Sequence, residues 1–206
     1  MSKFADADLE FEVRWLPFQL NPNASNEPSN RMQGYVDKFQ KSKAEIKQMS
    51  SWMQGNFSRV GLPYEFSEEA LTSNTFEAHR LLTAAYQHGG ATAQDRAAEL
   101  LFHAYFAEGS APNDPEVLRK AADAAGLDGK AFVADANMNA AETTEEFKVG
   151  RQLRVTGVPH FVITADGSGK AEQISGAQPP EEFTKAFHRI AKQGGASPKR
   201  EACLIS

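Results

Sequence analysis

The sequence predicts an α/β domain that carries a large helical insertion, and three segments support this. Apolar and charged residues alternate from Leu9 to Trp15, which is the period of a half-buried strand. From about residue 31 to residue 154, apolar residues recur at helical spacing. Val158 to Ile163 and Ala171 to Ser175 then have the pattern of a hairpin, and a final helix follows. A strand, a helical block, a hairpin and a helix in this order are typical of α/β architecture.

Capping signals divide the helical block into separate helices. Asp114 and Pro115 are an N-cap and a first-turn proline, and Gly126 is a typical C-terminal stop. Thr143 and Glu146 have the spacing of a capping box. We therefore expect helices at about residues 35–57, 74–89, 93–108 and 115–125, with another that opens at the Thr143 capping box.

Length and composition indicate one globular domain. The chain has 206 residues, of which 41% are hydrophobic, and this is enough to bury a core. Its net charge of -5 disfavours nucleic acid as a partner, because such binding rests on Lys and Arg that neutralise phosphates. We expect no transmembrane segment, since no apolar run approaches roughly 20 residues, and residues 1–8 lack a secretory h-region. A single cysteine, Cys203, fits a reducing, cytoplasmic location.

The predicted domain spans residues 1–193, with the helical insertion at about 31–154. Residues 194–206 are expected to form a flexible C-terminal tail, because Gly194 to Pro198 has the composition of a flexible linker.

Several motifs resemble one known family. Thr156 to Ile163 resembles the loop that enters a strand in thioredoxin-like proteins, where a Val-Pro peptide bond is cis and faces the redox cysteines. Other segments resemble the FrnE-like branch of the DsbA family and occur in its order: Trp15 to Pro22, Asn74 to Leu81, Leu101 to Phe106 and Ile174 to Pro180. The resemblance covers about residues 11–190. It implies a DsbA-like thioredoxin fold and a family of protein-disulfide oxidoreductases.

The resemblance also implies a substrate-binding site at Gly157, Val158, Pro159 and His160. Proline donates no backbone hydrogen bond, and a cis bond turns the preceding carbonyl and amide outward. The backbone of Val158 can then pair with a disulfide-containing peptide or with glutathione, as an added strand would. Glutathione enters here as a substrate, and no bound cofactor is expected. His160 and His79 are each either a ligand contact or a hydrogen-bonded structural histidine.

The sequence departs from this family at its N-terminus. Members begin with a strand and a Cys-x-x-Cys motif that opens a helix, and only then have the strand that matches Phe11 to Trp15. Both cysteines are missing, so no catalytic residue is assigned and the chain as written is expected to be redox-inactive. The missing strand would be central, and its absence predicts a gap of roughly 10 Å with unpaired amides on both sides. Either the start codon has been assigned too far downstream, which we favour, or this is a true short form.

Two other functions stay open. A glutathione-dependent isomerase or a kappa-class transferase shares the insert-bearing fold and needs no cysteine pair. A non-catalytic peptide-binding protein would use the same backbone at Val158.

The remaining candidates concern lipid and metal. Cys203 to Ser206 matches the C-terminal C-a-a-X pattern, which indicates either farnesylation, and so a prenyl membrane anchor, or an accidental tail. His103 and His188 fall in predicted helices and are interpreted as structural. No His, Asp and Glu cluster has the spacing of a metal site.

Overall fold

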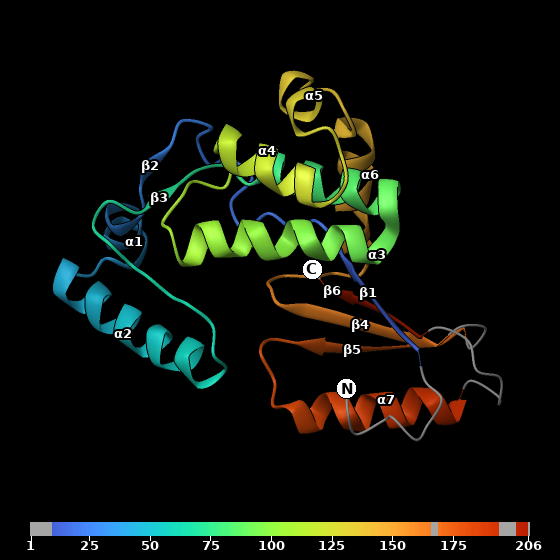
Figure 1. Cartoon of the computed structure of the whole chain (residues 1–206). Helices are drawn as coiled ribbons and strands as arrows, with labels where there is room; N and C mark the ends of the chain where they lie inside the picture. Colours follow the sequence, from blue (N-terminus) through green and yellow to red (C-terminus); the bar gives the residue numbers. More distant parts are fainter. Residues whose placement is uncertain (1–9, 166–168, 194–200, 206) are drawn as a thin grey trace. The chain divides into compact units, whose positions relative to one another are not determined.

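The computed structural model describes residues 10–165, 169–193 and 201–205, with the backbone alone for residues 193 and 201–205 (Figure 1). The chain divides into two compact units. Residues 1–20 and 141–206 form the sheet unit, and residues 21–140 form the helical unit. The helical unit thus ends before residue 154, the predicted end of the insertion, because most of the last helix of the block groups with the sheet unit.

The sheet unit is built on four strands: β1 (Phe11–Trp15), β4 (His160–Ala165), β5 (Ala171–Ser175) and β6 (Glu201–Ile205). Their order in the sheet is β1-β6-β4-β5 (Figure 1). Strand β6 runs parallel to β1 and antiparallel to β4, and β4 pairs antiparallel with β5. The predicted first strand and hairpin are therefore confirmed. The predicted turn at residues 166–167 lies outside the described residues.

The C-terminal segment corrects two predictions. Residues 201–205, predicted as part of a flexible tail, form the strand β6 that lies between β1 and β4. The predicted gap of roughly 10 Å is thus filled. The facing amides and carbonyls of β1 and β4 need partners, and the uncharged run from Ala202 to Ile205 supplies a strand. The prediction rested on the composition of Gly194 to Pro198, and residues 194–200 and 206 lie outside the described residues.

Helix α7 (Pro180–Gln193) packs on one face of this sheet. Ile163, Ala186 and Ile190 are almost fully buried there. The alternation in β1 has the same cause, since Val13 packs against this cluster. Two edge-to-face ring pairs add to it, Phe11 with Phe187 at 5.0 Å between ring centroids and Phe161 with Phe183 at 4.7 Å. The final helix predicted through Phe183, Phe187 and Ile190 is confirmed.

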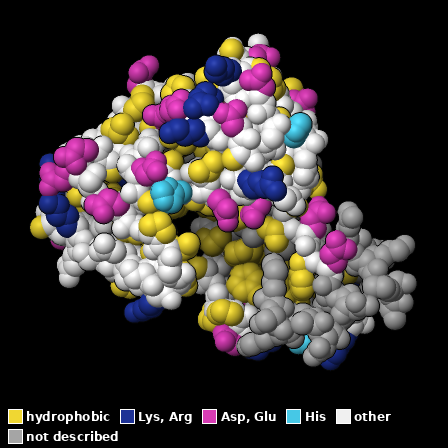
Figure 2. Space-filling model, viewed as in Figure 1, with side chains coloured by type: hydrophobic (Ala, Val, Ile, Leu, Met, Phe, Trp, Pro, Cys, Tyr) yellow, Lys and Arg dark blue, Asp and Glu magenta, His cyan; other side chains and the backbone are white. Residues whose placement is uncertain are grey.

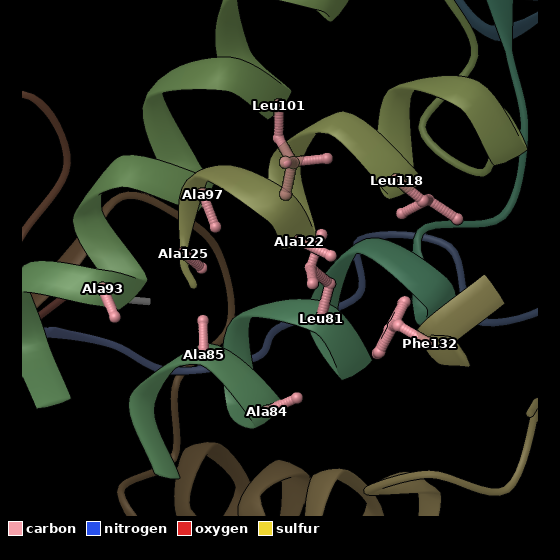
Figure 3. Packing of buried hydrophobic residues seen from close by; sticks show 11 residues of the cluster. Leu81, Ala84, Ala85, Ala93, Ala97, Leu101, Leu118, Ala122, Ala125 and Phe132 are labelled. Carbon is pink, nitrogen blue, oxygen red and sulfur yellow. The ribbon is translucent and has the colours of Figure 1, made fainter. Parts of the chain in front are cut away.

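The helical unit contains five helices within its described residues: α1 (Arg31–Phe39), α2 (Lys43–Arg59), α3 (Phe76–Phe106), α4 (Pro115–Ala124) and α5 (Gly129–Ala134). A short antiparallel pair, β2 (Ser29–Asn30) with β3 (Leu71–Thr72), joins the start of α1 to the loop before α3. The core of the helical unit is made mostly of small side chains, so α3 and α4 approach closely (Figure 3). The buried members are Leu81, Ala84, Ala85, Ala93, Ala97, Leu101, Leu118, Ala121, Ala122, Ala125 and Phe132.

Local capping signals predicted part of this unit correctly. Asp114 caps α4, because its carboxylate accepts the amides of Glu116 and Val117, and Pro115 stands in the first turn. The predicted break at Gly89–Gly90 is a kink inside the long helix α3, where both residues leave helical φ/ψ values. The φ of +66° at Gly90 is one that glycine adopts readily.

Two helix boundaries were predicted wrongly. The helix expected over 35–57 is broken at Gln40, which takes a φ of 53°, and α2 restarts behind a capping box made by Ser42 and Glu45. The box expected at Thr143 does not start a helix. Helix α6 (Ala140–Gln152) begins earlier, and Thr143 is fully buried within it.

Arg80 of α3 is 1% exposed and holds several chain segments of the helical unit together. Its guanidinium donates to the carbonyls of Asp135, Met138 and Phe132 and forms an ion pair with Glu77. The guanidinium carbon of Arg80 also lies 4.0 Å from the centroid of the Phe132 ring. This one side chain therefore ties α3 to α5 and to the loop after it.

We expect Arg80→Met to lower the stability of the chain by about 3–5 kcal/mol, because it leaves buried carbonyls without their donor. Arg119→Met is the matched control: Arg119 pairs with Glu116 and Asp123 on an open helix surface, where ion pairs contribute little. Urea unfolding followed by circular dichroism measures both. Equal midpoints for the two variants would contradict the role given to Arg80.

Candidate functional site

The predicted site lies at one edge of the sheet. Trp15 at the end of β1 and Ile205 at the end of β6 stand in register with each other, and Ile205 also stands opposite Phe161, near the start of β4. His160 stands opposite Ser175, where β5 ends. We call the segments Gly157–His160 and Ser175–Gly176 the Pro159 edge.

The backbone groups of Pro159 and Val158 differ in their hydrogen bonding. The Val158–Pro159 peptide bond is cis. The carbonyl of Pro159 accepts the amide of Gly176 at 2.8 Å, which fixes the loop to the end of β5. Val158 before it is 37% exposed, and no described residue hydrogen-bonds its backbone. The amide and the carbonyl of Val158 thus have no hydrogen-bond partner among the described residues.

The space beside the Cα of Gly157 is open. A Cβ added at Gly157 would meet no atom within 4 Å. Gly176 takes a φ of +78°, which lets the chain turn sharply after β5 and bring its amide to Pro159.

His160 is held inside the hairpin and is 6% exposed. Its Nε2 lies 3.1 Å from the side-chain oxygen of Gln173, and its Nδ1 lies 2.9 Å from the hydroxyl of Ser175. An amide oxygen only accepts, so the contact with Gln173 requires a proton on Nε2, and in a neutral ring Nδ1 then accepts from the hydroxyl of Ser175. His160 is thus hydrogen-bonded within the hairpin, and its contact with a ligand stays a prediction.

Three further histidines that the sequence singled out belong to helices. His79 and His103 belong to α3 in the helical unit, where His103 pairs with Glu108 on the surface. His188 is exposed on α7. Within the described parts of the chain, no group of three or more His, Cys, Asp or Glu residues could hold a metal ion.

Two ion pairs in the sheet unit join helices to strands. Arg189 of α7 donates to both carboxylate oxygens of Glu172 on β5, which lowers the pKa of that carboxyl from its ordinary value. Arg14 of β1 likewise pairs with Glu146 of α6. These pairs attach one helix to each of two strands.

The structure does not test the predictions of prenylation and of no nucleic-acid partner. Cys203 stands in β6 opposite both Val13 and Ile163. Among residues 10–165, 169–193 and 201–205 no helix has the length and apolar character to cross a bilayer. On the face in Figure 2, basic and acidic side chains are intermixed. Prenylation and the absence of a nucleic-acid partner stay predictions.

A sheet whose third strand in order begins directly after a cis-proline, with a helical unit inserted between its strands, defines a thioredoxin-like protein with a helical insertion. The family model of the DSBA-like thioredoxin domain matches residues 1–188, so the chain belongs to that family. The chain is similar to the crystal structure of a probable DsbA oxidoreductase from Streptomyces coelicolor. The two are 28% identical with a TM-score of 0.73, over 89% of this chain and 76% of that one. A search among curated proteins finds no match. Membership of the FrnE-like branch stays a prediction.

The hydrogen bonds of His160 give a testable tautomer. We expect long-range ¹H–¹⁵N spectra to show the proton of the neutral ring on Nε2, and Ser175→Ala to shift the Nδ1 signal because it removes that nitrogen's donor. Thr184→Ala is the control, since its hydroxyl binds the carbonyl of Pro180 on α7. A proton on Nδ1, or equal shifts in the two variants, would show this arrangement to be wrong.

Proposed function

We propose that this chain binds a disulfide-bearing peptide, or glutathione, as an added strand along the Pro159 edge. The observation that carries the proposal is that Val158 is exposed and its backbone hydrogen-bonds to no described residue, beside a proline whose own carbonyl is held by Gly176. Backbone pairing gives such a ligand affinity, and the side chains around it give specificity. Membership of a family consistent with thiol–disulfide oxidoreductases supports the class of ligand.

We further propose that the 206-residue chain does not itself turn over disulfides. Thiol–disulfide exchange by two thiols needs a nucleophile and a resolving cysteine, and the chain contains one cysteine. That residue, Cys203, belongs to the central strand, where its backbone faces β1 on one side and β4 on the other. The function that the geometry supports best is thus recognition of a disulfide-bearing peptide without exchange.

A peptide titration tests the binding. The Cys203→Ser variant, labelled with ¹⁵N, is titrated with a short extended peptide whose single cysteine is disulfide-bonded to glutathione, so that no exchange with the protein can occur. We expect the amide shifts to concentrate at Gly157, Val158, His160 and Gly176. The same peptide with N-methylated amides should bind at least about fivefold more weakly, because each backbone hydrogen bond contributes about 1 kcal/mol.

The peptide controls separate two failures. Equal affinity for the N-methylated peptide would contradict strand-like pairing. Shifts confined to the helical unit would place the ligand elsewhere and contradict the site itself.

An insulin-reduction assay tests the absence of turnover. In the presence of dithiothreitol, we expect the 206-residue chain and its Cys203→Ser variant to precipitate insulin at the rate of the protein-free control, because neither has a thiol pair. A faster rate for the unaltered chain that is lost in Cys203→Ser would assign exchange to Cys203 and overturn this proposal.

A further inference from the structure

The outer face of α2, in the helical unit, carries exposed apolar side chains. The inner face of the helix is packed, since Ile46 is buried and the ring of Phe57 lies 5.2 Å from the ring of Phe106 between centroids. On the outer face, Trp52 is 68% exposed and Val60, where the helix ends, is 70% exposed. We call the whole set the Trp52 row: Met49, Trp52, Met53 and Val60.

The Trp52 row is additional to the apolar side that joins α2 to its unit. Residues three and four apart on a helix are neighbours, so Met49, Trp52 and Met53 form one patch, and Val60 lies two turns beyond Met53. A surface helix needs one apolar stripe, which faces the core. Neighbouring apolar side chains that stay exposed beyond that stripe are typical of an interaction site.

The helix that carries the row is basic, although the chain is acidic. Residues 40–59 hold four Lys or Arg and one Glu, a net charge of +3, whereas the whole chain has a net charge of -5. The one Glu of this segment, Glu45, is paired with Lys41. Arg59 lies seven residues after Trp52 and therefore on the same side of the helix. Among the described residues its guanidinium donates only to the side chain of Asn56.

Acidic residues follow α2 in the chain, and the one that pairs with the helix does so on another side. Residues 65–69 contain three Glu, of which Glu68 pairs with Lys47. Lys47 precedes Trp52 by five residues, which is about 140° around the helix axis. The side of α2 that bears the Trp52 row thus has a basic residue, Arg59, without a carboxylate partner.

These features fit the surface of an anionic lipid bilayer. A basic helix with an apolar side that contains Trp is typical of segments that lie in the plane of such a surface. The row projects from a single convex helix, and a bilayer yields around projecting side chains, whereas a folded partner needs a groove shaped to them. The indole suits this depth because its ring is apolar and its N–H is polar.

We propose that α2 lies on an anionic membrane surface, with the Trp52 row among the lipid acyl chains and the basic residues of the helix at the headgroups. The occupant is negatively charged lipid, because the charge of α2 is opposite to that of the lipid. Peptide binding at the Pro159 edge is a separate proposal, and neither depends on the other.

Vesicle co-sedimentation of the full chain tests this proposal. One set of vesicles is phosphatidylcholine alone, and the other contains roughly 30% phosphatidylserine. We expect the chain to bind the anionic vesicles at least about tenfold more tightly and to release them as salt rises, because salt screens the charges of α2. No binding to the anionic vesicles, or equal binding to both sets, would overturn the proposal.

Serine variants locate the binding surface. Met49→Ser with Trp52→Ser should weaken binding to the anionic vesicles at least about tenfold, because it removes apolar surface from the row. Leu20→Ser is the matched control, since Leu20 lies in the sheet unit and is as exposed as Trp52, at 68%. The control should bind as the unaltered chain does. Equal losses in the two variants would show that the row is not the contact.

A pair of Arg59 variants tests the contribution of charge. Arg59→Glu should weaken binding to the anionic vesicles at least about threefold, because it replaces attraction to the headgroups by repulsion. Arg59→Lys keeps the charge and should bind as the unaltered chain does. Equal binding by Arg59→Glu and Arg59→Lys would contradict the orientation of α2 that is proposed.

Trp fluorescence covers the case in which the serine variants do not fold. In anionic vesicles whose lipids carry bromine on the acyl chains, we expect the fluorescence of the unaltered chain to be quenched. Trp52→Phe keeps an apolar ring in the row, so it should bind the vesicles without this quenching. Quenching that persists in Trp52→Phe would assign the lipid contact to Trp15, which is the other tryptophan, and overturn the proposal.

A soluble acidic amphipathic peptide is the alternative occupant of the Trp52 row. It is titrated in parallel with the vesicles, with the emission wavelength of Trp52 as the readout. If the peptide moves this emission to shorter wavelength and the anionic vesicles do not, the row is a protein-docking surface and the proposal is wrong.

Discussion

Strands β1 and β4 belong to one sheet only because β6 lies between them and pairs with both. The structure of the sheet unit depends on this pairing. Strand β6 pairs with both of them, in parallel with β1 and antiparallel with β4. The apolar cluster beneath α7 draws on both strands, since Val13 comes from β1 and Ile163 from β4. Backbone groups in such a position cannot be left without partners at low cost. The pairing of β6 is therefore a condition for the packing of α7 across the sheet, rather than an addition to it.

The helical unit solves a similar problem with side chains. Its loops leave carbonyl groups inside the unit, and two arginines that are almost fully buried supply the donors. Arg31 donates to the carbonyls of Leu71, Tyr105 and Ser110, and its guanidinium carbon lies 3.5 Å from the centroid of the Tyr105 ring. Burial lowers the pKa of Arg31 from its ordinary value. Arg80 likewise donates to buried carbonyls, among them that of Phe132. A guanidinium suits this role because its five donors lie in one rigid plane.

The sequence predicts those features whose causes lie within a few residues of one another. The cap at Asp114, the alternation in β1 and the apolar stripe of α7 all belong to this class. The break between α1 and α2 is also local, but the helical periodicity continues across Gln40 and conceals it. Thr143 has the spacing of a cap but is buried within α6. A spacing rule registers which residues are present and not which of them the core encloses.

The place of β6 could not be predicted in this way. Its register partners are about 40 and about 190 residues away along the chain, and nothing within residues 201–205 specifies them. The resemblance indicated that a central strand was needed at this place, yet it supplied no candidate to fill it. At the candidate site the outcome was similar. The resemblance indicated Pro159. Ser175 and Gln173, which are the partners of His160, follow from the β4–β5 register alone.

The candidate site and the central strand are held by different contacts, and this separates their roles. The amide of Gly176 binds Pro159, and Ser175 and Gln173 bind His160, so the hairpin of β4 and β5 sets the shape of the Pro159 edge. Strand β6 reaches this edge only with its last paired residue, Ile205, which stands opposite Phe161. The contacts that shape the loop at Val158 thus lie within the β4–β5 hairpin and do not involve β6.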